Sequence, residues 1–454
     1  MKNKKEINAF KQEVKVSQIT FNPRDFGAVR IHLIPPKISS NNIPESLVII
    51  NGNYILPIRK SHALLLFTFM NEMKKYDGIE LSENMLSNII RNCVKQVHNV
   101  YWKTPKKVIL KDLEILINSF IAIARGEKID IKSSNITSIS EYAQYMSAPH
   151  RMDLMVTPMT DSKGKWMCNN KCLHCYAAGQ IHSCEKQLCT DDWFKIIDKC
   201  ISAGIVQLTF TGGEPTMRND LVELIKYARF PITRLNTNGL LLSKDYCNKL
   251  KEAELDNLQI TFYSSQEKIH NKLVGNSNGF KKTVAGIRNA ISAGLSVSIN
   301  TPLCSINKDY VSTLKYLHSL GIMYVTCSGL ITTGNALKSE SQATQLAESE
   351  LYNILKSAVA YCQESGMELS FTSPGWLDEE LLRNLHLNVP TCGACLSNMA
   401  ITPSGNVVPC QSWLNGNILG NMLKDDWPTI WEKSSEIRNN SIKQDGTCPL
   451  KKER

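Results

Sequence analysis

The chain has 454 residues, enough for about three domains of roughly 150 residues each, and a chain of this size can bury a core without disulfides. Its 52 Lys and Arg residues outnumber 42 Asp and Glu residues, which gives a net charge of +10. These charges are scattered, so nucleic-acid binding is not indicated. No apolar stretch could cross a bilayer, and the N-terminus lacks the apolar core of a secretory signal. We therefore expect a cytoplasmic protein of enzyme size.

Residues 1–145 predict a small module made of a hairpin and three helices. Two short strands are expected over residues 47–57, on either side of Asn51-Gly52, a pair typical of tight hairpin turns. Apolar residues at helical spacing then predict helices near residues 62–76, 82–98 and 111–125. This order predicts a winged-helix-like module. The alternative is a helical cap on the domain that follows.

Residues 146–373 alternate between strand and helix patterns. Apolar or β-branched runs predict six strands, at residues 152–156, 205–210, 232–237, 258–263, 295–301 and 322–327. Several intervening helices end in a glycine that opens the next strand, namely Gly204, Gly294 and Gly321. The pattern predicts an α/β fold with a parallel barrel or an open sheet. In such folds the chemistry collects at the carboxyl ends of the strands.

The chain contains 15 cysteines but no export signal, which favours metal binding over a disulfide framework. Cys168, Cys172 and Cys175 lie in the loop after the first strand of this region. Three thiolates on one loop can hold an iron–sulfur cluster and leave its fourth iron open to another ligand. Zinc is the alternative metal, with His174 as a further ligand.

The spacing Cys168-x-x-x-Cys172-x-x-Cys175, followed by Tyr176, resembles the signature of radical S-adenosylmethionine (radical SAM) enzymes. Thr211-Gly212-Gly213-Glu214-Pro215, at the end of the second strand, resembles the glycine-rich motif of that family. The third strand ends in Thr237-Asn238-Gly239, which is also similar to the family pattern. The resemblance covers residues 150 to 340. It implies a partial (β/α)6 barrel over residues 146–373 that binds a [4Fe–4S] cluster and SAM.

The resemblance also implies roles for individual residues. Cys168, Cys172 and Cys175 would hold the cluster, whose open iron takes the amine and carboxylate of SAM. SAM itself would be contacted by Tyr176 near the adenine, by Gly212, Gly213, Glu214 and Pro215 near the methionine amino group, by Asn238, and by Thr261. Two positions depart from the family. A common Asp-Gly pair reads Tyr263-Ser264 here, and a common Arg-Gly pair reads Val274-Gly275, so that Lys272 is a candidate replacement for the arginine.

A second group of cysteines lies near the C-terminus. Cys392 and Cys395 precede a hairpin pattern that ends in Cys410, and Cys448 follows later, so these thiols could hold a second cluster or zinc. The SPASM/twitch extension of radical SAM enzymes is similar in the spacing Gly405-x-x-x-x-Cys410, in Leu419-Gly420-Asn421, in Ile430-Trp431 and in Arg438. The resemblance implies such a domain over residues 374–454. Because the sequence ends at Arg454, we predict one auxiliary [4Fe–4S] cluster held by Cys392, Cys395, Cys410 and Cys448, and two clusters in all.

Radical SAM enzymes cleave SAM reductively to a 5′-deoxyadenosyl radical, which takes a hydrogen atom from the substrate. The order of elements in residues 1–145 resembles the element with which many maturases of ribosomally made peptides (RiPPs) hold a leader peptide as an added strand. The predicted function is therefore RiPP maturation, an oxidoreductase reaction that forms a thioether or carbon–carbon crosslink in a precursor peptide. The implied partners are that peptide and a flavodoxin- or ferredoxin-type electron donor, with no membrane.

Other functions stay open at this point. A peptide epimerase would need a thiol hydrogen donor in the barrel, for which Cys304 and Cys327 are candidates, although both could be buried structural cysteines. Oxidation of a residue in a sulfatase-like protein, or of a small alcohol, is a further alternative. An iron–sulfur DNA-binding regulator would use the N-terminal module as a winged helix, but it would not need a SAM motif.

Overall fold

The computed structural model describes residues 17–21, 29–34, 46–50, 54–76, 79, 81–124, 143, 146–161, 163–443 and 448–451. The chain forms two compact units, residues 1–148 and 149–454. The predicted boundary after residue 373 falls inside the second unit, so the domain limits of 146–373 and 374–454 stay predictions.

The first unit contains a four-stranded antiparallel sheet in the order β1-β2-β3-β4. Its strands are β1 (Ser17–Phe21), β2 (Val29–Ile34), β3 (Ser46–Ile50) and β4 (Tyr54–Ile58). The sequence predicted only the hairpin of β3 and β4. It missed β1 and β2, which are five and six residues long, although Val29, Ile31 and Leu33 of β2 alternate with polar residues. The predicted Asn51-Gly52 turn lies outside the described residues.

Three helices follow this sheet, as the sequence predicted: α2 (Lys60–Lys74), α3 (Glu83–Val100) and α4 (Lys106–Ala124). Helix α2 is buried on two sides. Leu66 and Met70 pack with the sheet and with Phe120 of α4, whereas Leu65 and Phe69 pack against α3 and the start of α4. The order of a hairpin and three helices is therefore present, within a larger sheet than expected, and the winged-helix likeness itself stays a prediction.

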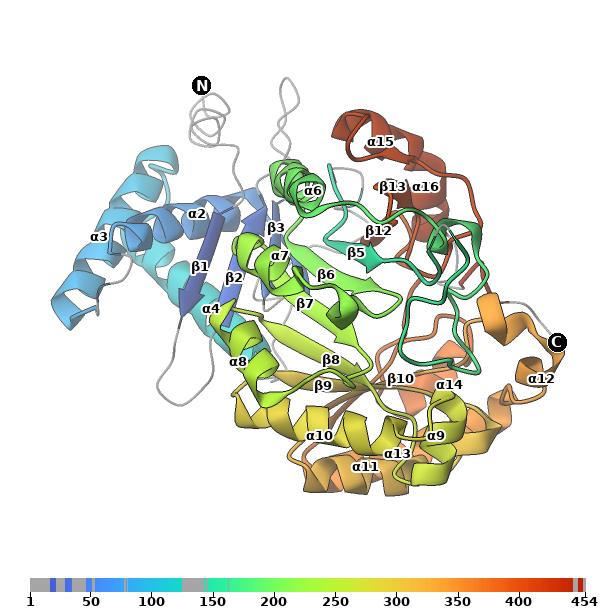
Figure 1. Ribbon diagram of the computed structural model, residues 1–454. Coiled ribbons are helices and arrows are strands. Elements are labelled where there is room, and N and C mark those ends of the chain that lie inside the picture. The colour runs from blue at the N-terminus through green and yellow to red at the C-terminus, as the bar shows by residue number, and fades with distance from the viewer. Residues whose placement is uncertain are drawn as a thin grey trace. The chain divides into compact units, whose positions relative to one another are not determined.

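The second unit is built on a mixed sheet of ten strands (Figure 1). Eight neighbouring strands are parallel, of which seven precede the C-terminal segment: β5 (Arg151–Thr157), β6 (Gln207–Gly212), β7 (Ile232–Thr237), β8 (Asn257–Thr261), β9 (Val297–Pro302), β10 (Tyr324–Ser328) and β11 (Glu368–Phe371). The first six match the predicted strands. The partial barrel thus has one strand more than the expected (β/α)6 arrangement, because β11 spans only four residues and its mixed sequence ELSF has no strong strand signal.

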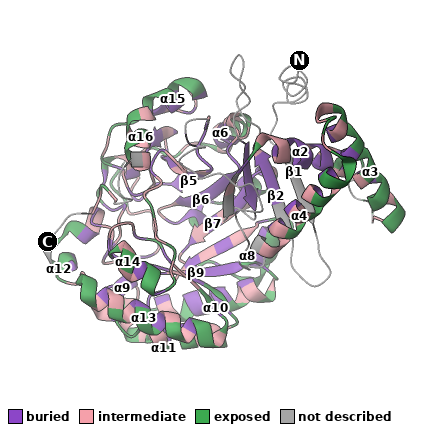
Figure 2. Cartoon of the chain, turned by 180° about the vertical axis from the view of Figure 1, so that it is seen from behind, coloured by how far each residue is buried: buried purple, intermediate pink, exposed green. Residues whose placement is uncertain are grey.

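Helices lie along the outer side of the parallel strands (Figure 1). Among them are α6 (Thr190–Ala203), α7 (Leu221–Tyr227), α8 (Lys244–Glu252), α10 (Gly279–Ser292), α11 (Tyr310–Ser319) and α13 (Glu348–Ser365). The second unit also contains α9 (Glu267–Val274), α12 (Ser339–Gln342) and α14 (Glu379–Asn384). Figure 2 shows the strands buried while α10, α11 and α13 expose their outer faces. Gly204, Gly294 and Gly321 follow helices with φ of 87°, 71° and 89°, which confirms them as helix stops.

The C-terminal segment extends the same sheet. Strand β12 (Asn398–Ile401) pairs in parallel with β5, followed by β13 (Asn406–Val408) and β14 (Gly420–Asn421) in antiparallel order. Helices α15 (Trp427–Lys433) and α16 (Ser435–Lys443) complete this segment. In the part of the chain that the structure describes, no helix is both long and apolar enough to span a membrane.

One buried carboxylate connects two helices of the first unit. Glu72 on α2 is 3% exposed. Its carboxylate accepts hydrogen bonds from Gln96 Nε2 at 2.7 Å and from Asn92 Nδ2 at 3.3 Å, both on α3, and from Lys75 Nζ at 2.5 Å. Burial alone would raise the pKa of Glu72, but these donors outweigh it and hold the pKa below its usual value.

Replacing Glu72 with Ala should lower the free energy of unfolding by about 1–3 kcal/mol, because the hydrogen bonds that the buried carboxylate accepts from Asn92 and Gln96 are lost. Since the pKa of Glu72 is depressed in the folded state, the ionised carboxylate stabilises the fold above its unfolded pKa, near 4.3, and this contribution is lost as pH falls through the folded pKa. Chemical denaturation of wild type and E72A at pH 7 and pH 3.5 measures it. An equal difference in the free energy of unfolding between wild type and E72A at both pH values would contradict the assigned role.

Candidate active site at the carboxyl ends of the parallel strands

A cavity of about 640 Å³ opens within the second unit. Its walls bring together most of the residues that the sequence singled out: Cys168, Cys172, Cys175, Tyr176, Gly212, Gly213, Glu214, Asn238, Thr261 and Cys448. Except for Cys448, these residues lie at the ends of β5 to β8 or in the loops that follow them. The cavity is therefore where a parallel sheet is expected to place chemistry.

The loop with the first three cysteines is held by backbone hydrogen bonds on both sides. Lys171 N donates to Val274 O and Leu173 N to Leu273 O, each at 2.9 Å, which ties the loop to the end of α9. From the other side, Asn335 donates its N to Cys175 O at 2.9 Å and its Nδ2 to Cys172 O at 3.2 Å. The positions of the thiols are thus set by the fold.

The three thiols lie within electrostatic range of one another, and Cys168 and Cys172 also lie within range of Glu214. Burial raises the pKa of Cys168 to about 12, with Glu214 adding to the shift, and burial also raises the pKa of Cys172 and Cys175. Three such thiols are stable as neutral groups unless a cation deprotonates them. This donor set fits an iron–sulfur cluster, which takes thiolate ligands. Among the described residues, no three Cys, His, Asp or Glu side chains are close enough to hold a single metal ion.

His174, the other ligand considered for zinc, is engaged elsewhere. Its Nε2 lies 2.7 Å from Thr344 Oγ1. Burial lowers the pKa of this imidazole to about 4, so the ring is neutral at pH 7.

Glu214 organises the ends of two strands. Its Oε1 accepts from Thr216 N at 3.0 Å, from Thr216 Oγ1 at 2.5 Å and from Thr237 Oγ1 at 2.6 Å, while its Oε2 accepts from Asn238 N at 2.9 Å. Burial raises the pKa of Glu214, and these donors oppose the shift. A carboxylate has about four acceptor sites. Oxygen Oε2, with a single protein donor, is therefore the one able to accept from a ligand ammonium group.

The predicted glycines let the backbone of β5 and β6 approach closely. A Cβ on Gly212 would lie 2.4 Å from Thr157 O, and one on Gly213 would lie 2.4 Å from Pro158 O. Pro215 then opens a single 3₁₀ turn, Pro215–Met217. At the end of β7, Asn238 Nδ2 donates to Asn169 Oδ1 at 2.6 Å and lies 3.9 Å from Cys168 Sγ. The family-like motifs therefore surround the cysteine loop.

Of the remaining residues considered for SAM binding, some line the cavity and one does not. Thr261 and Tyr263 line the cavity. Tyr176 also lines it, but its hydroxyl donates to Gln411 Oε1 at 3.4 Å, a residue of the C-terminal segment. Lys272 is exposed and is not among the described residues of the cavity wall. It is therefore poorly placed to replace the missing arginine.

Cys304 and Cys327, the candidate thiol donors, are fully buried. Cys304 packs in an apolar cluster with Leu273, Val274 and Leu330. Neither cysteine is among the described residues of the cavity wall, although Thr326 and Ser328 on either side of Cys327 are. Successive strand residues point to opposite faces, which leaves Cys327 outside the cavity.

The structure brings the cysteines near the C-terminus close to one another, and their role as cluster ligands stays a prediction. The thiol of Cys448 donates to the sulfur of Cys392, which lowers the pKa of Cys392. Burial raises the pKa of Cys395 and Cys410 to about 12 each, and these two thiols lie within electrostatic range of each other and of Cys392. Cys448 is also within range of Cys410. Four thiols from a loop, a hairpin and the tail fit the ligand number of a complete [4Fe–4S] cluster.

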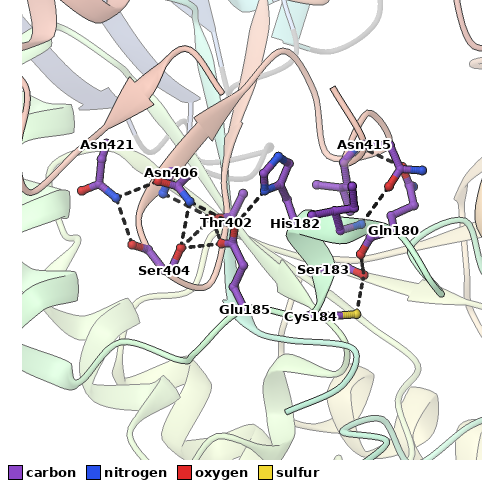
Figure 3. Close-up of polar contacts among 12 residues, drawn as sticks. Gln180, His182, Ser183, Cys184, Glu185, Thr402, Ser404, Asn406, Asn415 and Asn421 are labelled. Carbon is purple, nitrogen blue, oxygen red and sulfur yellow. Dashed lines mark hydrogen bonds and ion pairs between the residues drawn. The ribbon is translucent and has the colours of Figure 1, made fainter. Parts of the chain in front are cut away.

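A polar network joins the two cysteine-bearing segments (Figure 3). Glu185, which follows the first cysteine loop, accepts from Ser404 Oγ at 2.5 Å, from Asn406 Nδ2 at 3.0 Å, from Thr402 Oγ1 and from His182 Nδ1. Burial would raise the pKa of Glu185, but these hydrogen bonds hold it below its usual value. Gln180 adds a second connection, since it donates to Ser412 O and accepts from Leu414 N, each at 3.0 Å.

Family comparisons agree with this geometry. The radical SAM superfamily matches residues 167–317, and an iron–sulfur cluster-binding domain of the SPASM type matches residues 392–450. The chain contains a radical SAM domain and a SPASM domain. This confirms the predicted family of enzymes. Domains of the first kind bind a [4Fe–4S] cluster and SAM, and SPASM domains bind additional iron–sulfur clusters.

Several curated proteins are similar over part of their length. Fe-coproporphyrin III synthase of Methanosarcina barkeri is 31% identical over 185 residues, 40% of this chain and 46% of that protein. AdoMet-dependent heme synthase of Oleidesulfovibrio alaskensis is 28% identical over 301 residues, 62% of this chain and 76% of the relative. PqqA peptide cyclase of Bradyrhizobium diazoefficiens is 31% identical over 135 residues, 29% and 36% of the two chains. The chain thus spans about half or less of the first and last of these relatives.

Solved structures share the fold. Streptococcus suis SuiB bound to its precursor peptide SuiA has a TM-score of 0.59 at 14% identity, covering 89% of this chain and 92% of SuiB. The enzyme anSMEcpe with AdoMet and the Kp18Cys peptide has a TM-score of 0.52 at 18% identity, covering 65% and 84%. The SuiB match is longer than the second unit alone. The shared fold therefore extends into residues 1–148.

Sequence reasoning missed several residues of the site. Asn169, Asn276 and Asn335 hold the cysteine loop through side-chain hydrogen bonds. Arg151 and Arg234 also line the cavity. Arg234 could have been found, because an arginine inside the apolar run of a buried parallel strand is unusual. The asparagines carry no such signal.

Gly275 offers a test of the loop's support. It follows α9 with a φ of 61°, and a Cβ there would lie 2.3 Å from Lys171 O. Replacing Gly275 with Ala should displace the cysteine loop and reduce iron bound by Cys168, Cys172 and Cys175 several-fold. Gly294→Ala is the matched control, because Gly294 has a φ of 71° but no atom within 4 Å of an added Cβ. Both variants should lose about 1 kcal/mol of stability. The iron content per chain after reconstitution tests this prediction. Equal iron content in G275A and G294A would contradict it.

Proposed function

We propose that this chain is a radical SAM peptide maturase that forms a thioether or carbon–carbon crosslink in a precursor peptide. The observation that carries the proposal is that one cavity is lined by three clustered thiols, by the Glu214 and Asn238 strand ends and by Cys448 of the tail. The SuiB-like fold that extends into the N-terminal unit supports a peptide as the substrate. SuiB itself was solved with its precursor peptide.

The residues of the site would have separate roles in binding the clusters and SAM. Cys168, Cys172 and Cys175 would hold the first cluster, and Glu214 Oε2 would accept from the amino group of SAM. When bound, this cluster and SAM supply a carbon radical that takes hydrogen from the substrate. The protein contributes positioning and exclusion of water. Cys392, Cys395, Cys410 and Cys448 would hold one auxiliary cluster beside the same cavity, where the substrate could reach it.

The N-terminal sheet would bind the leader of the peptide as an added strand. Its two edges are β1 and β4. Pro57 within β4 lacks an N–H to donate, so β1 is the more complete edge. A flavodoxin- or ferredoxin-type donor and a cytoplasmic location complete the proposal.

Crosslinking is favoured over the alternatives. An epimerase needs a thiol hydrogen donor at the substrate, and Cys304 and Cys327 lie in the core. A DNA-binding regulator would have no use for the arrangement of Glu214, Asn238 and the cysteine loop around a cavity. Mass spectrometry separates crosslinking from the oxidation reactions. Both remove two hydrogens from the peptide, but only a crosslink keeps two fragments joined after proteolysis.

Replacing Cys168, Cys172 and Cys175 together with Ala should leave about one cluster per chain, since each site needs its own thiolates, and should abolish formation of 5′-deoxyadenosine. The matched variant, with Cys392, Cys395 and Cys410 replaced by Ala, should lose the auxiliary cluster but retain reductive SAM cleavage. Iron counting, Mössbauer spectroscopy and chromatography of nucleoside products measure these outcomes. Full iron content and activity in the first variant would defeat the assignment.

Peptide binding at the β1 edge can be tested with Ile19→Pro and Thr20→Pro. Successive strand N–H groups point to opposite sides, so one substitution removes a donor to β2 and the other a donor at the free edge. We expect wild type to bind a leader peptide encoded beside its gene with a Kd on the order of micromolar, and the edge-facing proline to weaken this about tenfold without lowering the Tm. Isothermal titration measures it. No binding of the peptide together with specific retardation of duplex DNA would favour the regulator instead.

A further inference from the structure

The cavity also contains two arginines that the proposed chemistry does not use. Arg151 on β5 and Arg234 on β7 are both part of its wall. The strand registers place Asp153, Thr209, Arg234 and Asn257 in one row across β5, β6, β7 and β8. Arg234 comes four residues before Asn238, roughly 13 Å along the strand at ~3.3 Å per residue. Thr209 and Arg234 of this row line the cavity, and with Arg151 they form a floor below the level of the cysteine loop.

The floor carries an excess of positive charge. Arg151 Nε lies 3.0 Å from Asp153 Oδ1, which forms an ion pair with Asp153 1% exposed. Arg234 donates its Nε to the neutral Asn257 Oδ1 at 3.0 Å and forms no ion pair with any residue that the structure describes. Two guanidinium groups thus share one carboxylate, which leaves a net charge of +1 at the floor.

This charge is costly in the absence of an anion. Burial lowers the pKa of Arg234 to about 10, and repulsion from Arg151 adds to the shift more than Asp153 opposes it. The guanidinium therefore stays charged at pH 7. Arg234 is half-buried in the cavity wall, where a cation is stabilised by an anion that pairs with it. Guanidinium groups bind carboxylates with two parallel hydrogen bonds, which is the pairing that best offsets this cost.

The rest of the floor is polar but neutral. Gln259, Asn300 and Thr326 line the same cavity and hydrogen-bond to one another, with Thr326 Oγ1 donating to Asn300 Oδ1 at 2.9 Å. On β7, the Oδ1 atom of Asn236 is buried without a hydrogen-bond partner. Such groups accommodate a polar ligand and supply no negative charge that could compete for Arg234.

We propose that Arg234, with Arg151 beside it, forms a subsite for a carboxylate group of the substrate. The carboxylate would belong to an acidic side chain or to the C-terminus of the peptide, so the inference rests on the proposed function and specifies its substrate. The carboxylate of SAM is a poor candidate, because the predicted SAM contacts Glu214 and Asn238 lie at the strand ends. Amine and carboxylate of SAM share one carbon, so both would stay at that level. Arg234 thereby becomes a specificity-determining residue.

Three small probes test the subsite with the full-length, cluster-reconstituted protein. N-acetyl-L-glutamate N-methylamide carries a side-chain carboxylate, N-acetylglycine carries a C-terminal carboxylate, and N-acetyl-L-glutamine N-methylamide is the neutral isostere of the first. We expect one carboxylate probe to bind, seen as a rise in Tm and as heat in calorimetric titration, and the neutral isostere to give neither. Which carboxylate binds decides between side chain and C-terminus. Equal responses to the glutamate and glutamine probes, or none to either carboxylate, would overturn the proposal.

Variants then assign the binding to the floor. Arg234→Gln should weaken the binding carboxylate probe at least tenfold, whereas Arg383→Gln, an exposed arginine of α14 paired with Glu379, should leave it unchanged. The affinity for SAM should be the same in R234Q and wild type. A weaker affinity for SAM alone would assign Arg234 to the SAM carboxylate and overturn the proposal. If R234Q does not fold, the affinity of Arg234→Lys for the carboxylate probe and the comparison of the probes on wild type still test the proposal.

Failure of this inference can be told apart from failure of the proposed function. Formation of 5′-deoxyadenosine is measured on the same wild-type samples. Cleavage of SAM without discrimination between the glutamate and glutamine probes would reject the carboxylate subsite alone. Discrimination between the probes in a protein that does not cleave SAM would retain the subsite and reject the radical SAM maturase.

Discussion

The pairing of β12 with β5 is the contact on which the arrangement of the second unit depends. Strand β5 leads into the loop of Cys168, and β12 begins three residues after Cys395, with Asn398 opposite Arg151 and Ile401 opposite Leu154. Two cysteine groups more than 200 residues apart in the sequence therefore start from neighbouring strands. Glu185 then joins the loop to the hairpin of β12 and β13 through Ser404 and Asn406. The strand pairing and these hydrogen bonds together fix how the two cysteine groups lie relative to each other.

Two carboxylates, the half-buried Glu185 and the buried Glu214, stabilise this arrangement. Glu185 and Glu214 each accept from at least three protein donors, and each connects segments from different parts of the chain. The pKa of Glu185 is depressed because its donors outweigh burial, whereas burial prevails at Glu214 and raises its pKa. Glu185 thus acts as a purely structural connection. Glu214 has its free acceptor site at the cavity, where a cationic ligand group would offset the cost of its burial.

The sequence predicts those parts of the fold that rest on local signals. Apolar periodicity located α2, α3, α4 and six parallel strands, and the glycines after α6, α10 and α11 marked their ends. The motifs around Cys168, Glu214 and Asn238 gave the family, because their chemistry requires fixed residue types. Strands β1, β2 and β11 were missed, since short strands gain their stability from neighbours that are distant in sequence. The same limit hid Glu185 and the asparagines of the cysteine loop, whose partners are set by strand register.

Register also explains why the interior of the barrel differs between its two levels. Alternate residues of each strand face inward, so Arg234, Asn236 and Asn238 follow one another along a single wall of the cavity. At the carboxyl end this wall reaches the thiol of Cys168, and deeper it presents a guanidinium group beside the Arg151–Asp153 pair. A packed core of apolar side chains would be more stable at this depth. An inward arginine without a carboxylate of its own therefore indicates a site shaped for an anionic group that arrives with the ligand.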